Sequence, residues 1–310
     1  MNYTMTNHLI SIIGPTAIGK TSLSIKLAQH FNTEIISADS RQFYKEMQIG
    51  TAAPTLTELA SAKHHFIHHK SIEDNYNVGT FEKDAIHLLN NLFQKHTVVI
   101  MVGGSGLYVD AVTKGFDYFP EVDSSIRTQL NKQLEEEGLE VLQLELKKLD
   151  SKAFQSIAID NPHRVIRALE ICIGTNQPYS SFLNKNKEQR NFKTITIGLT
   201  ADRDIIYDRI NTRVDIMIKE GLLDEVKSLV SKQNLNALNT VGYKELFNYY
   251  NDHWTLDFAI SEIKKNTRRF AKRQLTWFKK NKDTFWYQYD TAFSKIVEDL
   301  EKNNFPKKES

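Results

Sequence analysis

Two patterns of apolar and polar positions alternate along the first 115 residues. Short apolar runs occupy residues 9–13, 34–37 and 97–102, and amphipathic stretches with helical spacing cover residues 21–30 and 81–94. Short apolar runs separated by helices are typical of βα units, in which buried strands pair in parallel. The first third of the chain therefore predicts an α/β fold with a parallel sheet.

The pattern changes in the middle of the chain. From residue 122 to about 186 the apolar positions recur with helical periodicity, and no convincing strand interrupts them. Beyond this stretch we predict a strand at 193–199 and helices at 205–219, 222–231 and 261–280. The sequence thus predicts an α/β core formed by residues 1–120 and 190–310, which an all-helical insertion domain at residues 121–189 interrupts.

Length and composition agree with a globular protein of two lobes. A chain of 310 residues exceeds what a single hydrophobic core usually fills. A quarter of the residues are charged, and the formal net charge is only +2. No apolar stretch approaches the roughly 20 residues that a membrane span needs, and the N-terminus has no basic leader. We therefore expect a cytoplasmic protein without membrane contact, and a monomer because no long apolar stripe remains unassigned.

The segment GPTAIGKT directly follows the first apolar run. The spacing G-x4-G-K-T between a strand and a helix directs backbone amides and the positive helix end at one small volume. Lys20 would reach the terminal phosphates, and the Thr21 hydroxyl would hold Mg²⁺. The alternative is a chance glycine-rich turn. The segment predicts a site for a diphosphate or triphosphate formed by Gly14, Pro15, Thr16, Ala17, Ile18, Gly19, Lys20 and Thr21.

Polar residues follow the second apolar run at the predicted carboxyl end of its strand. These are Asp39, Ser40, Arg41 and Gln42. Open parallel sheets bind their ligands at this edge, so Asp39 is expected near the phosphate loop as a general base or a metal partner. Capping of the next turn is the alternative role for Asp39.

The apolar run at 98–102 lacks the acidic residue with which NTP hydrolases hold Mg²⁺. It continues instead into Gly103-Gly-Ser-Gly-Leu-Tyr108, where small residues let a ligand approach the backbone and Ser105 can donate a hydrogen bond. This turn argues against an ATPase or a kinase.

Basic residues concentrate near the end of the chain. Residues 261–285 contain nine lysines and arginines against two acids, interleaved with aromatic residues. Such a segment can neutralise a phosphate backbone, although a solvated helix face has the same composition. Arg213, one helical turn after Arg209, could bring a guanidinium group to a diphosphate. The histidines at 64, 65, 68 and 69 fit no standard zinc spacing, so we do not expect them to bind a metal.

Seven blocks between residues 8 and 280 resemble, in order, those of bacterial tRNA dimethylallyltransferases. They are GPTAIGKT, SADSRQFY, GGSGLY, NPHRVIRALE, RINTRVDIMIKEGLLDEV, VGYKE and TRRFAKRQLTWF. The resemblance implies a P-loop fold like that of nucleotide kinases, with dimethylallyl diphosphate and Mg²⁺ at the phosphate loop. It also implies transfer of the dimethylallyl group to the exocyclic amine of adenosine 37, in tRNAs that read codons beginning with U, giving isopentenyladenosine and diphosphate.

The same resemblance implies roles for individual residues. Asp39 would act as the base, Ser105 and Arg127 would line the channel of the flipped adenine, and Arg213 would hold the diphosphate. The implied catalytic set is Asp39, Ser105 and Arg213. Contacts with the tRNA anticodon stem-loop are implied for Asp39, Ser40, Arg41, Gln42, Ser105, Arg127, His163, Arg164, Val165, Ile166, Arg167, Asn239, Thr240, Val241, Gly242, Tyr243, Lys244, Lys272, Arg273, Gln274, Leu275, Thr276, Trp277, Phe278 and Lys279.

Two positions depart from the family pattern, because Ile18 stands where a serine is common and Lys63 where a proline is common. Two other functions remain open at this point. An ATP-dependent kinase would use the same loop for ATP, and a non-catalytic RNA-binding module would leave Asp39 dispensable.

Overall fold

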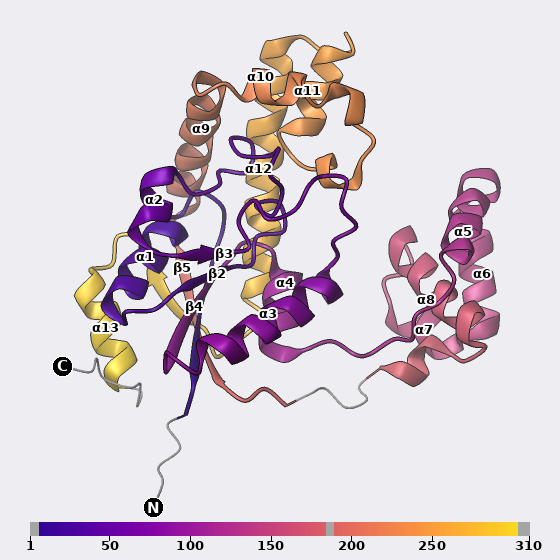
Figure 1. The fold of residues 1–310 in the computed structure, drawn as a ribbon. Helices are drawn as coiled ribbons and strands as arrows, with labels where there is room; N and C mark the ends of the chain where they lie inside the picture. The colour runs from indigo at the N-terminus through magenta and orange to yellow at the C-terminus, as the bar shows by residue number, and fades with distance from the viewer. Residues whose placement is uncertain (1–5, 184–188, 303–310) are drawn as a thin grey trace, which may run out of the picture. The chain divides into compact units, whose positions relative to one another are not determined.

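The computed structural model describes residues 6–183 and 189–302 and divides the chain into two compact units (Figure 1). The first unit comprises Met1–Thr113 and Arg190–Ser310, and the second comprises Lys114–Gln189. The predicted domains also included residues 1–5, 184–188 and 303–310, which lie outside the described residues. The first division precedes the predicted boundary at residue 121, because helix α4 ends at Lys114.

A six-stranded sheet forms the centre of the first unit, with the strand order β3-β2-β4-β1-β5-β6. Every pair of neighbouring strands is parallel, and Ile10 of β1 lies between Ile100 and Ile195. The described strands are β1 His8–Ile13, β2 Ile35–Ser37, β3 His64–His65, β4 Val98–Val102, β5 Lys193–Thr200 and β6 Phe285–Gln288. The predicted parallel sheet is confirmed. The edge strands β3 and β6 escaped prediction because they are short and not fully buried.

Helices cover both faces of this sheet (Figure 1). Alternate residues of β1 point to opposite faces, so Ile10 packs with residues of α1, α9 and α13, and Leu9 packs with residues of α3 and α4. The described α-helices of this unit are α1 Lys20–His30, α2 Leu56–Ser61, α3 Val78–Leu92, α4 Gly106–Lys114, α9 Arg203–Lys219, α10 Leu222–Lys227, α11 Tyr243–Tyr250, α12 Leu256–Phe278 and α13 Phe293–Lys302. Helix α12 begins before the predicted residue 261, because Thr255 caps it by accepting a hydrogen bond from the Phe258 amide.

Helix α12 contributes to the hydrophobic cores on both faces of the sheet. Ala271 packs in the core with α1 and α9, whereas Phe278 packs in the core with α3 and α4. Gln274 lies between them on the same side of the helix and is also buried. Positions i, i+3 and i+7 share one helix face, so this polar side chain belongs to an otherwise apolar buried stripe.

The second unit consists of helices packed around their own core. Its described elements are α5 Ser124–Glu137, α6 Leu139–Leu149, α7 Ser151–Ser156, α8 Pro162–Thr175 and a 3₁₀ turn at Tyr179–Phe182, with no strand. Leu130, Leu142, Leu146 and Leu169 are among its buried residues. The predicted helical periodicity is thus confirmed. Among all described residues, no helix combines the length and apolar character required to cross a membrane.

Candidate active site

The phosphate loop connects β1 to α1 and depends on two glycines. Gly14 has a φ of 144°, and a Cβ atom there would lie 2.6 Å from the carbonyl oxygen of Leu199 on β5. Gly19 has a φ of 108° and forms the N-cap of α1. Residues with a side chain rarely adopt such angles, so both positions require glycine. The chain therefore turns directly from the central strand into the helix, as the spacing predicts.

Three side chains hold this loop in place. Lys20 Nζ donates to the Pro15 carbonyl at 2.8 Å, and Arg209 Nε donates to the Ala17 carbonyl at 2.8 Å. The amide of Thr16 donates to Gln274 Oε1 at 2.9 Å. Gly14 and Pro15 are buried and shape the loop through these contacts, and their part in binding a diphosphate stays a prediction.

Ile18, which departs from the family pattern, is also buried. Its side chain belongs to the core cluster around Ile10 and Leu27, and its Cγ2 would lie 3.4 Å from a Cβ atom at Gly14. The isoleucine is accommodated by packing on the core side of the loop.

A cleft of about 950 Å³ opens above the phosphate loop. Its walls come from the polar turn after β2, the glycine-rich turn after β4, and helices α9 and α12. Predicted residues that line the cleft are Thr16, Ala17, Ile18, Gly19, Lys20, Thr21, Asp39, Ser40, Arg41, Gln42, Ser105, Arg213, Asn239, Thr240, Val241, Gly242, Lys244, Arg273, Gln274 and Trp277. The fold therefore gathers segments that are distant in the sequence at the carboxyl edge of the sheet, where parallel sheets bind ligands.

Three charged groups in the cleft influence one another. The pKa of Lys20 is lowered to about 8, because burial and the Arg213 charge together outweigh the opposing effect of the Asp39 charge. Burial raises the pKa of Asp39, against the opposing effects of the Arg41 amide and of the Lys20, Arg41 and Arg213 charges. Burial also lowers the pKa of Arg213, and nearby Arg209 acts in the same direction. Two cations and one carboxylate thus share a poorly hydrated volume, which is typical of catalytic sites.

The turn that carries Asp39 is locked from two directions. Asp39 Oδ1 accepts a hydrogen bond from the Arg41 amide at 3.2 Å, so the carboxylate does cap its own turn while it lines the cleft. Ser105 Oγ accepts from the Ser40 amide at 3.1 Å and lies 3.1 Å from Ser40 Oγ. The hydroxyl of Ser105 therefore joins the turn after β4 to the turn that carries the proposed base.

Arg41 and Gln42 hold neighbouring loops of the cleft. The Arg41 guanidinium donates to the carbonyls of Asn236 and Ala237 at 3.0 and 2.8 Å. Gln42 Nε2 donates to the carbonyls of Thr51 and Ala52 at 3.3 and 3.1 Å. Much of the hydrogen-bonding capacity of both side chains is thus used inside the protein, although both also line the cleft, and their contact with RNA stays a prediction.

Glu225 on α10 holds another wall of the cleft and was not identified from the sequence. Its carboxylate accepts hydrogen bonds from the amides of Gln48, Ile49 and Gly50 at 2.7–2.9 Å, and from the Tyr243 hydroxyl at 2.6 Å. The partners lie far away in the chain, so no local pattern could reveal them. The segment at 48–50 is therefore fixed to α10 and α11.

Four predicted RNA contacts are wrong, because their side chains are buried in hydrophobic cores. They are Val165, Ile166, Tyr243 and Phe278. These residues occupy the apolar positions of amphipathic helices, and an interior side chain offers no surface to RNA. In the same helical segments, the exposed residues are His163, Arg164, Lys244, Lys272, Arg273, Thr276 and Lys279.

Arg127 and Arg167 belong to the helical unit, where both bind one carboxylate. Arg127 Nη2 and Arg167 Nη1 each lie 2.9 Å from Glu170 Oε2. The two hydrogen bonds and positive charges hold the pKa of Glu170 below its usual range, although burial opposes this shift. The pair forms a fixed cationic group on α5 and α8.

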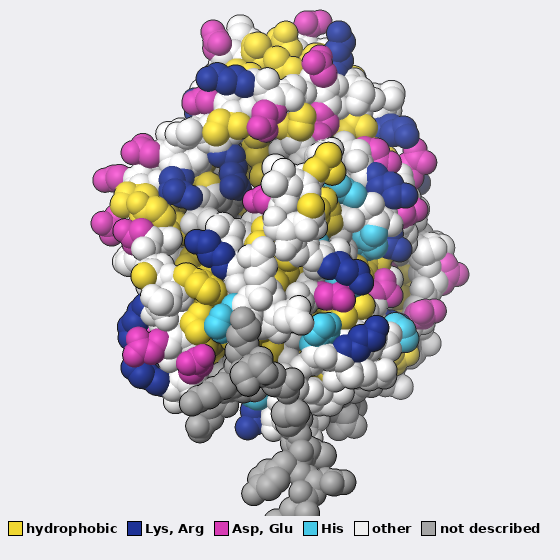
Figure 2. All heavy atoms as spheres, turned by 60° about the vertical axis from the view of Figure 1, so that its left-hand side comes forward, with side chains coloured by type: hydrophobic (Ala, Val, Ile, Leu, Met, Phe, Trp, Pro, Cys, Tyr) yellow, Lys and Arg dark blue, Asp and Glu magenta, His cyan; other side chains and the backbone are white. Residues whose placement is uncertain are grey.

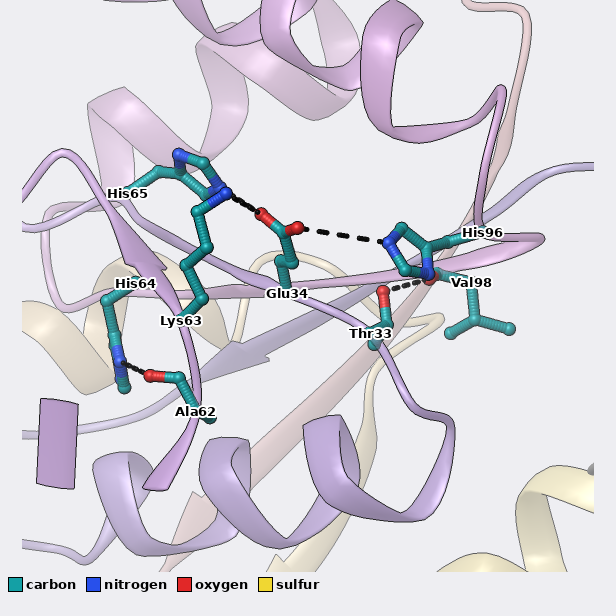
Figure 3. Close-up of polar contacts among 8 residues, drawn as sticks. All are labelled: Thr33, Glu34, Ala62, Lys63, His64, His65, His96 and Val98. Carbon is teal, nitrogen blue, oxygen red and sulfur yellow. Dashed lines mark hydrogen bonds and ion pairs between the residues drawn. The ribbon is translucent and has the colours of Figure 1, made fainter. Parts of the chain in front are cut away.

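Histidines near β3 form part of a hydrogen-bonded cluster at the edge of the sheet (Figure 3). His65 Nε2 lies 2.5 Å from Glu34 Oε2, and Lys63 Nζ lies 3.1 Å from the same oxygen. His96 lies 4.0 Å from the other carboxylate oxygen, and His64 contacts the Ala62 carbonyl at 2.8 Å. These contacts join β3 to the start of β2. Lys63, the second departure from the family pattern, takes part in them.

Positive charge does not dominate the face of the molecule that Figure 2 shows. On the face drawn in Figure 2, Lys and Arg side chains are interspersed with Asp and Glu side chains. By contrast, the exposed residues at the end of α12 include Lys272, Arg273 and Lys279 and no acid. This part of α12 is accordingly the basic element next to the cleft.

Comparison with known proteins finds relatives over most of the chain. A family model described as IPP transferase matches residues 42–281. A tRNA dimethylallyltransferase of Christiangramia forsetii is 62% identical over 297 residues, which cover 96% of this chain and 98% of the relative. A tRNA dimethylallyltransferase of Flavobacterium johnsoniae is 57% identical over 302 residues, with the same coverages of 96% and 98%.

Solved structures with the same fold have similar descriptions. A crystal structure of a tRNA isopentenylpyrophosphate transferase from Bacillus halodurans matches with a TM-score of 0.71 and 38% identity, covering 96% of this chain and 95% of that chain. A eukaryotic dimethylallyltransferase acting on tRNA matches with a TM-score of 0.81 and 26% identity, covering 98% of this chain and 82% of that chain.

Proposed function

The chain belongs to the IPP transferase family, and on this premise we propose that it transfers a dimethylallyl group from dimethylallyl diphosphate to the exocyclic amine of adenosine 37 in tRNAs that read codons beginning with U. The observation that carries the proposal is the grouping of Asp39, Lys20 and Arg213 in one cleft above the phosphate loop. An anion site beside a carboxylate suits a reaction in which a diphosphate leaves and an amine loses a proton.

Stabilisation of the leaving group is the main demand of this reaction. An amine on an aromatic ring is a weak nucleophile, so attack on the allylic carbon depends on neutralising the departing diphosphate. A carbon–nitrogen bond forms while the carbon–oxygen bond to the diphosphate breaks. Lys20 and Arg213 would balance the negative charge that develops on the diphosphate, and their poorly hydrated surroundings strengthen this effect.

Asp39 would receive the proton that the attacking amine loses. Its carboxylate lines the cleft, and the Arg41 amide holds one of its oxygens. Asp39 thus acts as a hydrogen-bond acceptor that orients the amine and as the base that completes the transfer. Ser105, which is tied to Ser40, would help to define the position of the adenine beside this base.

The donor set at the phosphate loop suits Mg²⁺. This ion prefers oxygen ligands and commonly keeps several waters while it binds substrate phosphates. Thr21, at the first turn of α1 and on the wall of the cleft, would provide a hydroxyl oxygen, and the diphosphate would provide the others. When bound, Mg²⁺ would supply further charge neutralisation at the leaving group.

The target base must leave the stacked anticodon loop before it can reach Asp39. Enzymes that act on a base pay an unstacking free energy of a few kcal/mol and recognise the extruded base in a pocket. The cleft, with Asp39 and Ser105 on its wall, is suited to receive such a base. The exposed basic residues of α12 would contact the RNA backbone.

Incubation of the protein with labelled dimethylallyl diphosphate, Mg²⁺ and an unmodified anticodon stem-loop tests the proposal. We expect label to appear in the RNA at adenosine 37. A parallel incubation with γ-labelled ATP tests the kinase alternative, for which label would pass to an acceptor. Folded protein that binds the stem-loop but transfers no label would refute prenyl transfer and favour an RNA-binding module.

The pH dependence of the reaction is expected to reflect the ionisation of Lys20. Its pKa of about 8 means that the ammonium loses its proton as the pH rises through this value, so the affinity for the diphosphate should fall. Asp39 must be ionised, and its raised pKa places the acidic limb above the usual range for aspartate. The kcat/KM for dimethylallyl diphosphate should therefore follow a bell with an alkaline limb near pH 8. A kcat/KM that stays constant up to about pH 9.5, more than one pH unit above the expected limb, would contradict this assignment.

Removal of positive charge at the basic end of α12 should lower the affinity for RNA more than it lowers the rate of the transfer step. The variants Lys272→Ala and Arg273→Ala are each expected to reduce the slope of log Kd against log salt by about one, with little change in kcat at saturating tRNA. Filter binding of tRNA between low and high salt measures the slope. Lys295→Ala on α13, where the lysine pairs with Asp299, is the matched control. An unchanged slope in both α12 variants would exclude this surface from backbone contact.

A further inference from the structure

Gln274 is a buried polar side chain with partners in two different segments that line the cleft. Its Oε1 accepts from the Thr16 amide of the phosphate loop at 2.9 Å. Its Nε2 donates to the Gly104 carbonyl in the turn after β4 at 2.8 Å. The side chain is 5% exposed, so both ends of its amide are used within the protein. One amide group therefore connects the loop for the leaving group with the turn on the adenine side.

The connection lies close to the proposed base. A Cβ atom at Gly104 would lie 2.4 Å from Gln274 Nε2 and 3.6 Å from Asp39 Oδ2. Gly104, the Gln274 amide and the Asp39 carboxylate thus meet in one small volume. Gly104 is therefore a shared neighbour of the Gln274 amide, which binds the phosphate loop, and of the Asp39 carboxylate.

The helix that carries Gln274 cannot move freely. Ala271, one turn before it, is packed in the core on one face of the sheet, and Phe278, one turn after it, is packed in the core on the other face. Trp277 Nε1 also donates to Asp110 Oδ2 on α4 at 2.9 Å, and a Cβ atom at Gly106 would lie 2.4 Å from the Trp277 ring. The helix is therefore anchored in both cores, and the Gln274 amide acts as a spacer that sets the separation between Thr16 of the phosphate loop and Gly104 of the turn after β4.

From these contacts we propose that Gln274 is a positioning residue, which fixes the distance between the departing diphosphate and the Asp39 carboxylate. This inference rests on the proposed function and assigns Gln274 a role inside the protein in place of the RNA contact predicted from the sequence. Transfer requires the amine, the allylic carbon and the diphosphate to lie nearly in line. A spacer that sets this alignment should affect the rate at saturation and leave the affinities for both substrates nearly unchanged.

Replacement of the amide by an apolar side chain of similar length tests the role of Gln274. The variant Gln274→Met is expected to lower kcat by about 100-fold, the scale of a misalignment near 1 Å. The KM for dimethylallyl diphosphate and the Kd for tRNA should change little. Gln29→Met on α1, which removes an exposed amide bond to the Ser61 carbonyl, is the matched control and should behave as the unaltered protein. A kcat within about threefold of the unaltered value, or a loss confined to tRNA affinity, would overturn the proposal, since misalignment has a far larger effect.

A double-mutant cycle with Gly104 distinguishes a specific coupling between Gly104 and Gln274 from general damage to the fold. The variant Gly104→Ala places a carbon 2.4 Å from Gln274 Nε2, so it should displace the amide and lower kcat. In the background of Gln274→Ala this clash is absent, and the remaining neighbour, Asp39 Oδ2, lies at an ordinary contact distance of 3.6 Å. The second substitution should then add little. Additive losses of kcat would overturn the coupling.

Hydrogen exchange at Thr16 provides a measurement that requires no catalysis. The Thr16 amide is expected to exchange faster in Gln274→Met than in the unaltered protein, and to be unaffected in Gln29→Met. An unchanged exchange rate of the Thr16 amide in Gln274→Met would overturn the proposed role of Gln274, even if the unaltered protein is an active enzyme. Conversely, suppose that the unaltered protein transfers no label while the Thr16 amide exchanges faster in Gln274→Met. That result would support the contact between Gln274 and the phosphate loop and refute the proposed function.

Discussion

The variant Asp39→Asn is expected to lower the rate of dimethylallyl transfer by about 10²- to 10⁴-fold, which is the usual contribution of a general base. An asparagine retains an oxygen that can accept from the Arg41 amide, so the turn should persist. Its amide cannot accept the proton of the attacking amine. Single-turnover transfer to a saturating stem-loop measures the loss, and the Kd for tRNA should remain near that of the unaltered protein.

A second effect of Asp39→Asn provides an internal check. The Asp39 charge raises the pKa of Lys20, so its removal should move the alkaline limb of any residual activity to lower pH. Asp208→Asn on α9, where the carboxylate is exposed, is the matched control and should alter neither rate nor profile. A rate for Asp39→Asn within a few-fold of the unaltered protein would show that Asp39 is not the base.

The variant Lys20→Met is expected to lower kcat/KM for dimethylallyl diphosphate by about 10³-fold, the upper range for loss of one preorganised donor. Lys20 would contribute a full charge at the diphosphate, and a methionine of similar length can neither supply that charge nor donate a hydrogen bond. Steady-state kinetics at saturating stem-loop measures the change.

The same helix provides the control for this variant. Lys26 on α1 is exposed, so Lys26→Met changes the net charge equally without altering the cleft. It should retain normal kinetics, and the Kd for tRNA should be normal in both variants. A Lys20→Met protein with intact diphosphate affinity but weakened tRNA binding would refute the assignment of Lys20 to the leaving group.

Local patterns predicted the framework of the first unit well. The largely apolar strands β1 and β4 are fully buried, and burial on both faces leaves such strands without the alternation of half-exposed strands. The edge strands β3 and β6 have two and four residues, and none of these residues is buried, so no buried apolar run marks them in the sequence. The phosphate loop was predictable because its angles require glycine at positions set by spacing alone.

Side-chain partners that are distant in the sequence explain what was missed. Gln274 was assigned to the RNA surface because it stands in a block that resembles a tRNA-binding stretch of the family, yet it reaches Thr16 and Gly104 in the interior. Glu225 holds the segment at 48–50 across a separation that no local pattern spans. The buried residues of the same blocks were assigned to RNA because a contiguous motif does not separate the two sides of a helix.

Helix α12 carries the residues proposed to contact RNA and the residue proposed to position the reacting groups on different sides of the same helix. Its inward side carries Ala271, Gln274 and Phe278, where any change of volume would disturb both cores or the cleft. Its outward side carries Lys272, Arg273 and Lys279, which contact solvent. If both proposals hold, evolutionary substitutions on the outward side would change the affinity for the RNA backbone without disturbing the alignment of the reacting atoms.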